Sequence, residues 1–321
     1  MPLGEFDLIA QYFAQLGARR NDVALGVGDD GAILVPPPDH ELVVVIDSLV
    51  AGRHFPPNSP AASIGHRVVA VNLSDLAAMG ATPAWALLAL TLPSADEAWL
   101  AEFALGAGAS LQRFGVALVG GDTTAGPLTI TAQLCGFVPR GTALRRDGAR
   151  PGDAVIVSGT TGDAAFGLAL EQDRHAGDSE SARVLRQRFL YPTPRCELGI
   201  ALRGIATACI DVSDGLAADL GKLCQASGCG AEIDLEALPL SAALQAVVER
   251  GHARESALNG GDDYELCFTV RPTEFARLAD LAQHSATPLT RIGTVTERSG
   301  ITLRDGAAVT QVSHRGFDHF A

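Results

Sequence analysis

The chain has 321 residues, 47% of them hydrophobic and 19% charged, so it can bury one large core or two medium ones. Its formal net charge of −13 disfavours nucleic acid or an anionic membrane as a main partner. No apolar run reaches membrane-spanning length, and residues 1–5 lack the basic start of a signal peptide. We therefore expect a cytoplasmic protein.

Two residue types constrain the chemistry further. The 24 basic residues include a single lysine, Lys222, so a phosphate site in this chain would have to use arginine or metal ions. The six cysteines form no C-x-x-C pair, and Cys224 and Cys229 have no nearby histidine to complete a zinc site. Reduced and mostly buried thiols are expected.

The first segments are a predicted helix at residues 5–16 and a glycine-rich turn within residues 23–34. Asp29 and Asp30 are adjacent in that turn. Neighbouring carboxylates repel one another, and a bound cation would relieve the repulsion. A plain hairpin turn is the alternative interpretation.

Residues 42–47 form a predicted strand that ends on Asp47. A carboxylate at the end of an apolar strand lies where open α/β architectures place ligand groups. In the following loop, Arg53, His54 and Phe55 are adjacent. This cluster either faces solvent or contacts a substrate.

Residues 67–81 are predicted to form a helix that is apolar almost all round. Its middle carries Asn72, Ser74 and Asp75, and the i, i+3 spacing places Asn72 and Asp75 on one face. An ionised carboxylate in apolar surroundings is costly unless a positive charge meets it. Asp75 is therefore a candidate metal ligand. The alternative is a break at Asn72 and Ser74, with Asp75 capping a second helix.

A glycine pair followed by an acid recurs at residues 116–124, where a strand leads into Gly120, Gly121 and Asp122. The amides after the glycines could hold a phosphate, with Asp122 binding its metal ion. The neighbouring predicted elements are a strand at 85–92, a helix at 96–114 and a strand at 128–138.

Residues 141–153 are polar and contain Gly and Pro, so we expect a domain boundary there. The segment carries Arg145, Arg146 and Arg150. Arginine stays charged and binds two oxygens at once, which makes it a suitable phosphate ligand. Ordinary surface arginines are the alternative.

The second half repeats the pattern of strand, turn and acid. Asp211 and Asp214 bracket the turn after a strand that starts at 208, and an ordinary helix cap would explain one of them. Asp262 and Asp263 follow two glycines. Residues 159–162 lead into a helix whose N-terminus could bind an anion. The other predicted elements are strands at 154–158, 231–235, 266–270 and 289–295, helices at 183–190, 197–206, 241–250 and 273–282, and a hairpin at 305–306.

Acidic residues thus recur beside glycines or at strand ends along the whole chain. If they converge, they form a site of oxygen ligands only, which suits Mg²⁺ and disfavours zinc. The chain lacks both the G-x-x-x-x-G-K-[ST] motif and the protein-kinase signatures. Metal ions and Arg146 would therefore have to neutralise the phosphate charge.

Eight motifs, taken in order, resemble the thiamine-monophosphate kinase family of the aminoimidazole ribonucleotide synthetase-like superfamily. They are G-V-G-D-D-G-A, I-D-S-L-V-A-G-R-H-F, N-L-S-D-L-A-A-M-G-A, G-G-D-T-T, R-D-G-A-R-P-G-D, I-D-V-S-D-G-L, G-G-D-D-Y-E-L and G-F-D-H-F. The resemblance implies an α+β fold of two domains. Residues 1–148 would form a mixed sheet with helices that binds ATP and Mg²⁺ and dimerises. Residues 149–321 would form an α/β sandwich-like domain that completes the active site.

The same resemblance implies transfer of the γ-phosphoryl group of ATP to thiamine monophosphate by a homodimer, with several Mg²⁺ ions. The implied metal ligands are Asp30, Ile46, Asp47, Asp75, Asp122, Asp211 and Asp214. The implied nucleotide contacts are Gly121, Asp122, Arg146 and Ser213, and the implied substrate contacts are His54, Asp262 and Phe317. Arg146, Asp75 and Asp122 would be the catalytic residues.

Four positions depart from the family pattern. Ile46 replaces a hydroxyl residue, so a metal contact there would use its backbone carbonyl. Ala125 replaces a frequent arginine, Asp262 replaces the usual glutamate with a shorter side chain, and Phe317 replaces Trp or Tyr. Three alternatives remain: another ATP-dependent kinase or synthetase of the superfamily, a nucleotide- or metal-binding protein without turnover, and a metal-dependent phosphohydrolase.

Overall fold

The computed structural model describes residues 4–172 and 179–312, which belong to two compact units. The first unit ends at Gly141 and the second begins at Thr142. The short segment Ala77–Gly80 also groups with the second unit. The division falls at the start of the polar segment 141–153. The roles assigned to the two domains remain predictions.

The first unit is built on a four-stranded mixed sheet with the strand order β3-β6-β4-β5. β3 and β4 pair antiparallel with β6, and β5 pairs parallel with β4. The strands are β3 (His40–Val50), β4 (Thr82–Leu92), β5 (Ala117–Ala125) and β6 (Thr129–Pro139). The shorter elements are α1 (Glu5–Leu8), the π-helix η1 (Ile9–Phe13) and the pair β1 (Val23–Leu25) and β2 (Ile33–Leu34).

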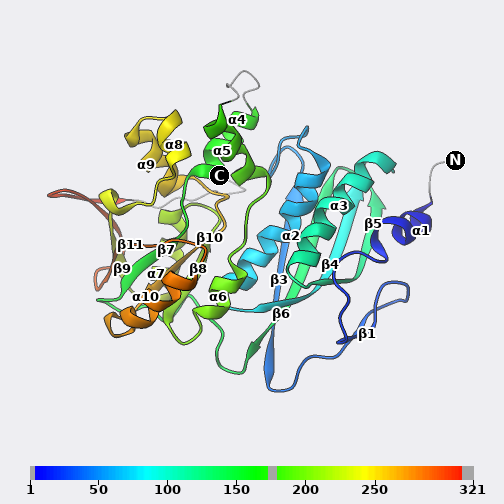
Figure 1. Cartoon of the computed structure of the whole chain (residues 1–321), viewed down its shortest axis with the longest axis horizontal. Helices are drawn as coiled ribbons and strands as arrows, with labels where there is room; N and C mark the ends of the chain where they lie inside the picture. Colours follow the sequence, from blue (N-terminus) through cyan, green and yellow to red (C-terminus); the bar gives the residue numbers. More distant parts are fainter. Residues whose placement is uncertain (1–3, 173–178, 313–321) are drawn as a thin grey trace. The chain divides into compact units, whose positions relative to one another are not determined.

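Two helices, α2 (Ala61–Ala78) and α3 (Glu97–Arg113), cover one face of this sheet (Figure 1). They approach closely because each carries a glycine at the contact. A Cβ on Gly65 would lie 2.1 Å from the carbonyl oxygen of Phe103, and one on Gly106 would lie 1.9 Å from that of Ala62. Under these helices, the alternate residues Ile130, Ala132 and Leu134 of β6 are buried. On the opposite face, Val23, Ala32 and Leu34 pack on the cluster that contains Trp85 and Phe137, and the rest of that face is open.

The second unit is built on a seven-stranded sheet with the order β13-β12-β9-β11-β7-β10-β8. α7 packs on β8, β9 and β12. The buried residues between this helix and the sheet form the main core of the second unit. The strands are β7 (Ala154–Ser158), β8 (Ala206–Val212), β9 (Gly230–Asp234), β10 (Glu265–Val270), β11 (Leu289–Thr296), β12 (Gly300–Asp305) and β13 (Ala308–Val312). The α-helices are α4 (Asp163–Gln172), α5 (Glu180–Leu190), α6 (Cys196–Ala201), α7 (Leu216–Ser227), α8 (Ala242–Val247), α9 (Arg250–Asn259) and α10 (Phe275–His284), with the 3-10 turns η2 (Leu235–Ala237) and η3 (Pro272–Glu274).

Several predicted boundaries differ from the structure. α2 is continuous through Asn72 and Ser74, so the alternative in which Asp75 caps a second helix is wrong. β3 continues past Asp47, and the glycine pair lies inside β5 rather than after it. The predicted helix 197–206 is the shorter α6, which ends at Ala201, and β8 begins at Ala206.

Two further expectations concern the whole chain. None of the six cysteines, all of which lie in the described part, forms a disulfide, and five of them are buried. Burial raises the pKa of Cys224 to about 12, which keeps that thiol protonated and unreactive at neutral pH. In the described ranges, no helix is long and apolar enough to cross a membrane.

Candidate functional site

The open face of the first unit's sheet carries a cavity of about 740 Å³. Three carboxylates line it: Asp29 and Asp30 from the glycine-rich turn between β1 and β2, and Asp122 from β5. Ile46 and Leu87 line its apolar part from β3 and β4. The structure therefore brings together two predicted metal ligands, Asp30 and Asp122, and places Ile46 with them.

A bulge in β5 sets the direction of Asp122. Ala86 pairs with Leu118 but Leu87 pairs with Gly120, so one extra residue lies in β5 at that point. Beyond the bulge, Gly121 lies so close to β4 that a Cβ would be 2.0 Å from the carbonyl oxygen of Leu88. The glycine is needed for this approach, not for a turn. β5 is an edge strand, so alternate backbone N–H groups point away from β4 and are available to a ligand.

Asp47 and Asp75 lie elsewhere in the first unit. Asp47 pairs with the buried Ala132, and strand alternation places it on the face opposite Ile46. Asp75 is half-buried on α2. Both carboxylates already interact with other described residues.

His54 lies at the end of a tight turn after β3. Its Nδ1 accepts a hydrogen bond from the backbone N–H of Val50 at 3.0 Å. Nδ1 acts as the acceptor there, so the proton of the neutral ring is on Nε2.

In the second unit, the turn after β8 is organised by a residue that the sequence did not single out. Asp219, in the first turn of α7, accepts hydrogen bonds at 2.9 Å from the backbone N–H groups of both Ser213 and Asp214. Neither Asp211 nor Asp214 caps the helix, because the N-cap position is Gly215. The simple capping explanation for these two aspartates is therefore wrong.

Lys222, the only lysine, bridges this turn. Its Nζ lies 2.5 Å from Asp214 and 2.7 Å from Asp219. Burial lowers the pKa of Lys222, but the two carboxylates outweigh it and raise the pKa above the usual value. Lys222 therefore stays charged and holds the Asp214 carboxylate in place.

Arg145 and Arg146 differ in their surroundings. Arg145 forms an ion pair with Asp147. Arg146 is exposed, and its side chain has no hydrogen-bond or ion-pair partner among the residues that the structure describes. This contrast favours Arg146 over Arg145 as the arginine that can bind a phosphate.

The turn that carries Asp262 lies against the turn after β8. The backbone N–H of Asp262 donates to the carbonyl oxygen of Ser213 at 2.9 Å. The structure thus brings a predicted substrate contact next to a predicted nucleotide contact within the second unit. Phe317 lies outside the described residues.

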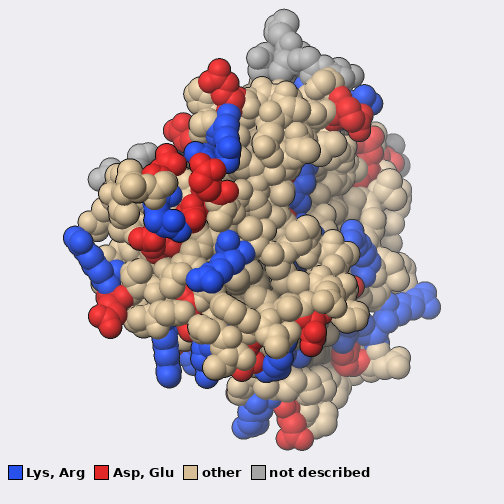
Figure 2. All heavy atoms as spheres, turned by 60° about the vertical axis from the view of Figure 1, so that its left-hand side comes forward, with Lys and Arg blue, Asp and Glu red and all other residues tan. Residues whose placement is uncertain are grey.

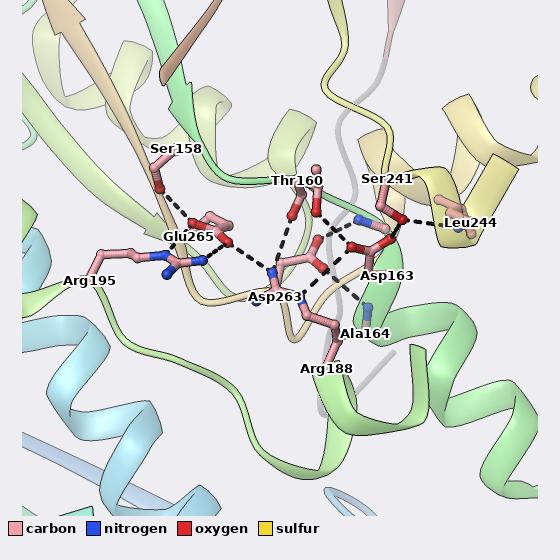
Figure 3. Close-up of polar contacts among 11 residues, drawn as sticks. Ser158, Thr160, Asp163, Ala164, Arg188, Arg195, Ser241, Leu244, Asp263 and Glu265 are labelled. Carbon is pink, nitrogen blue, oxygen red and sulfur yellow. Dashed lines mark hydrogen bonds and ion pairs between the residues drawn. The ribbon is translucent and has the colours of Figure 1, made fainter. Parts of the chain in front are cut away.

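Beneath this turn is a buried charge network that sequence reasoning missed (Figure 3). Glu265 is fully buried and contacts both Arg188 and Arg195. Asp263 accepts hydrogen bonds from the N–H groups of Gly162 and Ala164, and burial raises its pKa well above the usual value. The N-terminus of α4, considered above for an anion, is therefore occupied by the chain's own carboxylate. The sequence feature that could have indicated this network is Glu265, a charged residue at the start of the apolar strand β10.

Within residues 4–172 and 179–312, no three His, Cys, Asp or Glu side chains are grouped as a metal site. The candidate ligands are carboxylate oxygens and, at Ile46, a backbone carbonyl oxygen, which is the kind of donor that Mg²⁺ prefers. Mg²⁺ is commonly bound by one or two carboxylates together with waters and substrate phosphates. The donors present fit that mode of binding. On the face drawn in Figure 2, acidic and basic side chains are interspersed and form no single basic patch.

Comparison with known proteins defines the class. Residues 28–138 match the family "AIR synthase related protein, N-terminal domain", and residues 150–306 match the corresponding C-terminal domain. The chain is therefore an AIR synthase-related protein with the predicted two-domain α+β fold.

The relatives narrow this class. The chain is 49% identical to thiamine-monophosphate kinase of Escherichia coli K12, covering 100% of this chain and 99% of that protein, and 44% identical to that of Haemophilus influenzae Rd, with the same coverage. The crystal structure of thiamine-monophosphate kinase from Stenotrophomonas maltophilia K279a is 48% identical, with a TM-score of 0.85 over 90% of this chain and 93% of that one. AaThiL complexed with AMPPCP and TMP is 34% identical, with a TM-score of 0.80 over 92% of each chain. The chain belongs to the thiamine-monophosphate kinase family, as its motifs predict.

Proposed function

We propose that this protein transfers the γ-phosphoryl group of ATP to thiamine monophosphate, giving thiamine diphosphate and ADP, in the last step of thiamine diphosphate biosynthesis. The observation that carries the proposal is the identity of 49% over the full chain to a thiamine-monophosphate kinase. A relative of the same fold was solved with AMPPCP, an ATP analogue, and TMP.

The proposed roles follow the family motifs. Asp30, Ile46, Asp47, Asp75, Asp122, Asp211 and Asp214 contribute oxygen ligands to Mg²⁺. Gly121, Asp122, Arg146 and Ser213 bind the nucleotide, and His54, Asp262 and Phe317 bind thiamine monophosphate. The cavity lined by Asp30 and Asp122 and the contact between Asp262 and Ser213 support two parts of this assignment.

The chemistry requires alignment and charge neutralisation. The acceptor phosphate is anionic and already a nucleophile, so a strong general base is unnecessary. Bound Mg²⁺ supplies positive charge to the phosphate oxygens. Arg146 is always protonated and can bind two of these oxygens, which favours the charge distribution of the transition state. Transfer is direct and in line, so incubation with ATP alone should leave no kinetically competent phosphoprotein.

An acceptor screen tests the function. ADP release is measured with ATP and Mg²⁺ in the presence of thiamine monophosphate, thiamine or formylglycinamidine ribonucleotide. Turnover with thiamine monophosphate alone is expected. Turnover with the ribonucleotide instead would show another synthetase of the superfamily. ATP binding without product would show a regulatory protein, and phosphate release without acceptor would show a phosphohydrolase.

We further propose that two copies pair through their N-terminal sheets. β3 is an edge strand, and its open face exposes Leu42, Val44 and Ile46 by 48, 52 and 62%. A row of exposed apolar side chains on an edge strand is a site for association. Val44→Asp should convert a dimer to a monomer in light scattering. Leu105→Asp, at another exposed leucine, is the control and should remain dimeric. A wild-type monomer would refute the pairing.

A further inference from the structure

The turn between α9 and β10 contains two residues in an unusual backbone conformation. Asp262 has φ of 70° and Tyr264 has φ of 53°. Residues with a Cβ rarely adopt positive φ, and a bulky residue such as tyrosine does so least. Such conformations persist only where the surrounding contacts fix them, and they often mark functional positions.

Hydrogen bonds fix this turn from two sides. The backbone N–H of Asp262 donates to the carbonyl oxygen of Ser213, and that of Tyr264 donates to the carbonyl oxygen of Val212, both at 2.9 Å. Between them, the side chain of Asp263 points into the unit and accepts from Gly162 N–H at 2.7 Å. Asp263 is 1% exposed, and Figure 3 shows its side chain within the buried charge network. The buried aspartate thus anchors the turn.

One hydrogen bond then links those neighbours. The hydroxyl of Tyr264 donates to Oδ1 of Asp262 at 2.9 Å. Tyr264 is 7% exposed, so its ring is fixed by packing, whereas Asp262 is half-buried and reaches solvent. A packed tyrosine therefore restrains a more accessible carboxylate.

We propose that Tyr264 is a positioning residue for thiamine monophosphate: its hydroxyl fixes the Asp262 carboxylate in the direction that contacts the organic half of the substrate. The proposal rests on the proposed function, because it takes Asp262 as a substrate contact. A carboxylate suits that half of the molecule, which carries a cationic thiazolium ring and an aminopyrimidine. Aspartate has one methylene fewer than glutamate, so its reach depends more strongly on the backbone and on this hydrogen bond.

Tyr264→Phe keeps the ring and removes the hydroxyl. Losing one hydrogen bond to a charged group corresponds to roughly a tenfold effect. We expect the KM for thiamine monophosphate to rise about tenfold while the KM for ATP keeps its wild-type value. Calorimetric titration of thiamine monophosphate should show the same loss of affinity. A residue that only supports the fold would instead lower Tm and change both KM values together, which would overturn the proposal.

A double-mutant cycle identifies the route of the effect. Asp262→Ala should raise the KM for thiamine monophosphate by itself, and adding Tyr264→Phe to it should cause no further rise. Full additivity would overturn the positioning role. Tyr12→Phe, which removes a hydroxyl that donates to the backbone carbonyl oxygen of Glu97 in the first unit, is the control and should behave as wild type.

Two results separate this inference from the proposed function. If Asp262→Ala raises the KM for thiamine monophosphate but Tyr264→Phe does not, the positioning role is wrong and the substrate contact stands. If Asp262→Ala has no effect on that KM in an active kinase, the substrate contact is wrong and the positioning role is refuted with it.

Discussion

Arg195 holds Glu265 through two parallel hydrogen bonds in the second unit, with Nε 2.7 Å from Oε2 and Nη2 2.5 Å from Oε1. Glu265 is fully buried and also accepts from Ser158 Oγ at 2.7 Å and Arg188 Nη2 at 2.9 Å. All its oxygens are thus hydrogen-bonded, which offsets the cost of burying the charge. β10 begins with this residue and continues directly from the Asp262 turn, so the ion pair supports the candidate site from below.

Glu265→Gln should reduce the free energy of unfolding by about 3–5 kcal/mol, because Arg195 loses the carboxylate that it pairs with and Arg188 is left with the longer contact to Asp163, at 3.8 Å. Urea unfolding of the two proteins measures this difference. Arg183→Gln breaks an ion pair with Glu180 whose side chains are 60 and 79% exposed, and it should cost less than about 1 kcal/mol. Equal losses in both variants would contradict the structural role of Glu265.

Asp22 should give the first unit a pH-dependent stability. Arg20 donates to both of its carboxylate oxygens and Trp85 Nε1 donates to one of them, and these bonds hold the pKa of Asp22 below the usual 3.8 despite burial. A lowered pKa stabilises the fold above the unfolded value, and this contribution is lost as the pH falls through the folded value. Asp22→Asn should therefore be about 1–2 kcal/mol less stable at neutral pH.

That difference should shrink once the pH falls below 3.8, where the wild-type carboxyl is protonated in the unfolded chain and then in the folded one. Urea unfolding at neutral and at acidic pH, with tryptophan fluorescence as the signal, measures this difference in the free energy of unfolding. If the stability difference between the two proteins stays constant with pH, the charge of Asp22 does not contribute to the stability of the fold.

Local patterns in the sequence predict much of the fold. The apolar run 154–158 has the same bounds as β7, and the Asp305-Gly306 turn joins β12 to β13. Asp96, at the start of the predicted helix 96–114, caps α3 by accepting from Ala98 and Trp99. These features depend on neighbours within a few residues, and the amino-acid types alone are enough to indicate them.

Features that depend on distant partners are not predictable in this way. The ion pairs of Glu265 join residues 77 and 70 positions apart, and no local pattern points to Arg188 or Arg195. Gly120 and Gly121 suggest a turn by composition, yet pairing with β4 makes them a strand. The motif order identifies the family and the candidate site residues, whereas the packing that orients Asp122 and Asp262 follows only from the folded chain.

Gly121 should tolerate no side chain, whereas Gly120 should. A Cβ at Gly121 would lie 2.0 Å from the carbonyl oxygen of Leu88, which is backbone and cannot move without separating β5 from β4. A Cβ at Gly120 would meet only the end of the Leu87 side chain, at 3.1 Å. Gly121→Ala should cost at least about 2 kcal/mol and Gly120→Ala less than about 1 kcal/mol, measured by urea unfolding. The reverse order would contradict the bulge in β5.

Asp75 and Asp122 should be essential for transfer but not for folding. Asp122 lines the cavity, and Asp75 is a half-buried acid in the middle of α2, so both are candidate ligands of a metal ion. Asp122→Asn and Asp75→Asn should each lower kcat by about 100-fold or more and raise the Mg²⁺ concentration required, as measured by thiamine diphosphate formation. Circular dichroism and Tm should stay close to the wild type.

Asp96→Asn is the matched control for these two variants. It makes the same chemical change in the first unit, at a helix N-cap where asparagine is as favourable as aspartate. It should keep wild-type kcat, Mg²⁺ dependence and Tm. Wild-type turnover in Asp75→Asn would remove that residue from the metal site, and an equal loss of activity in Asp96→Asn would mean that any lost charge in this unit impairs transfer.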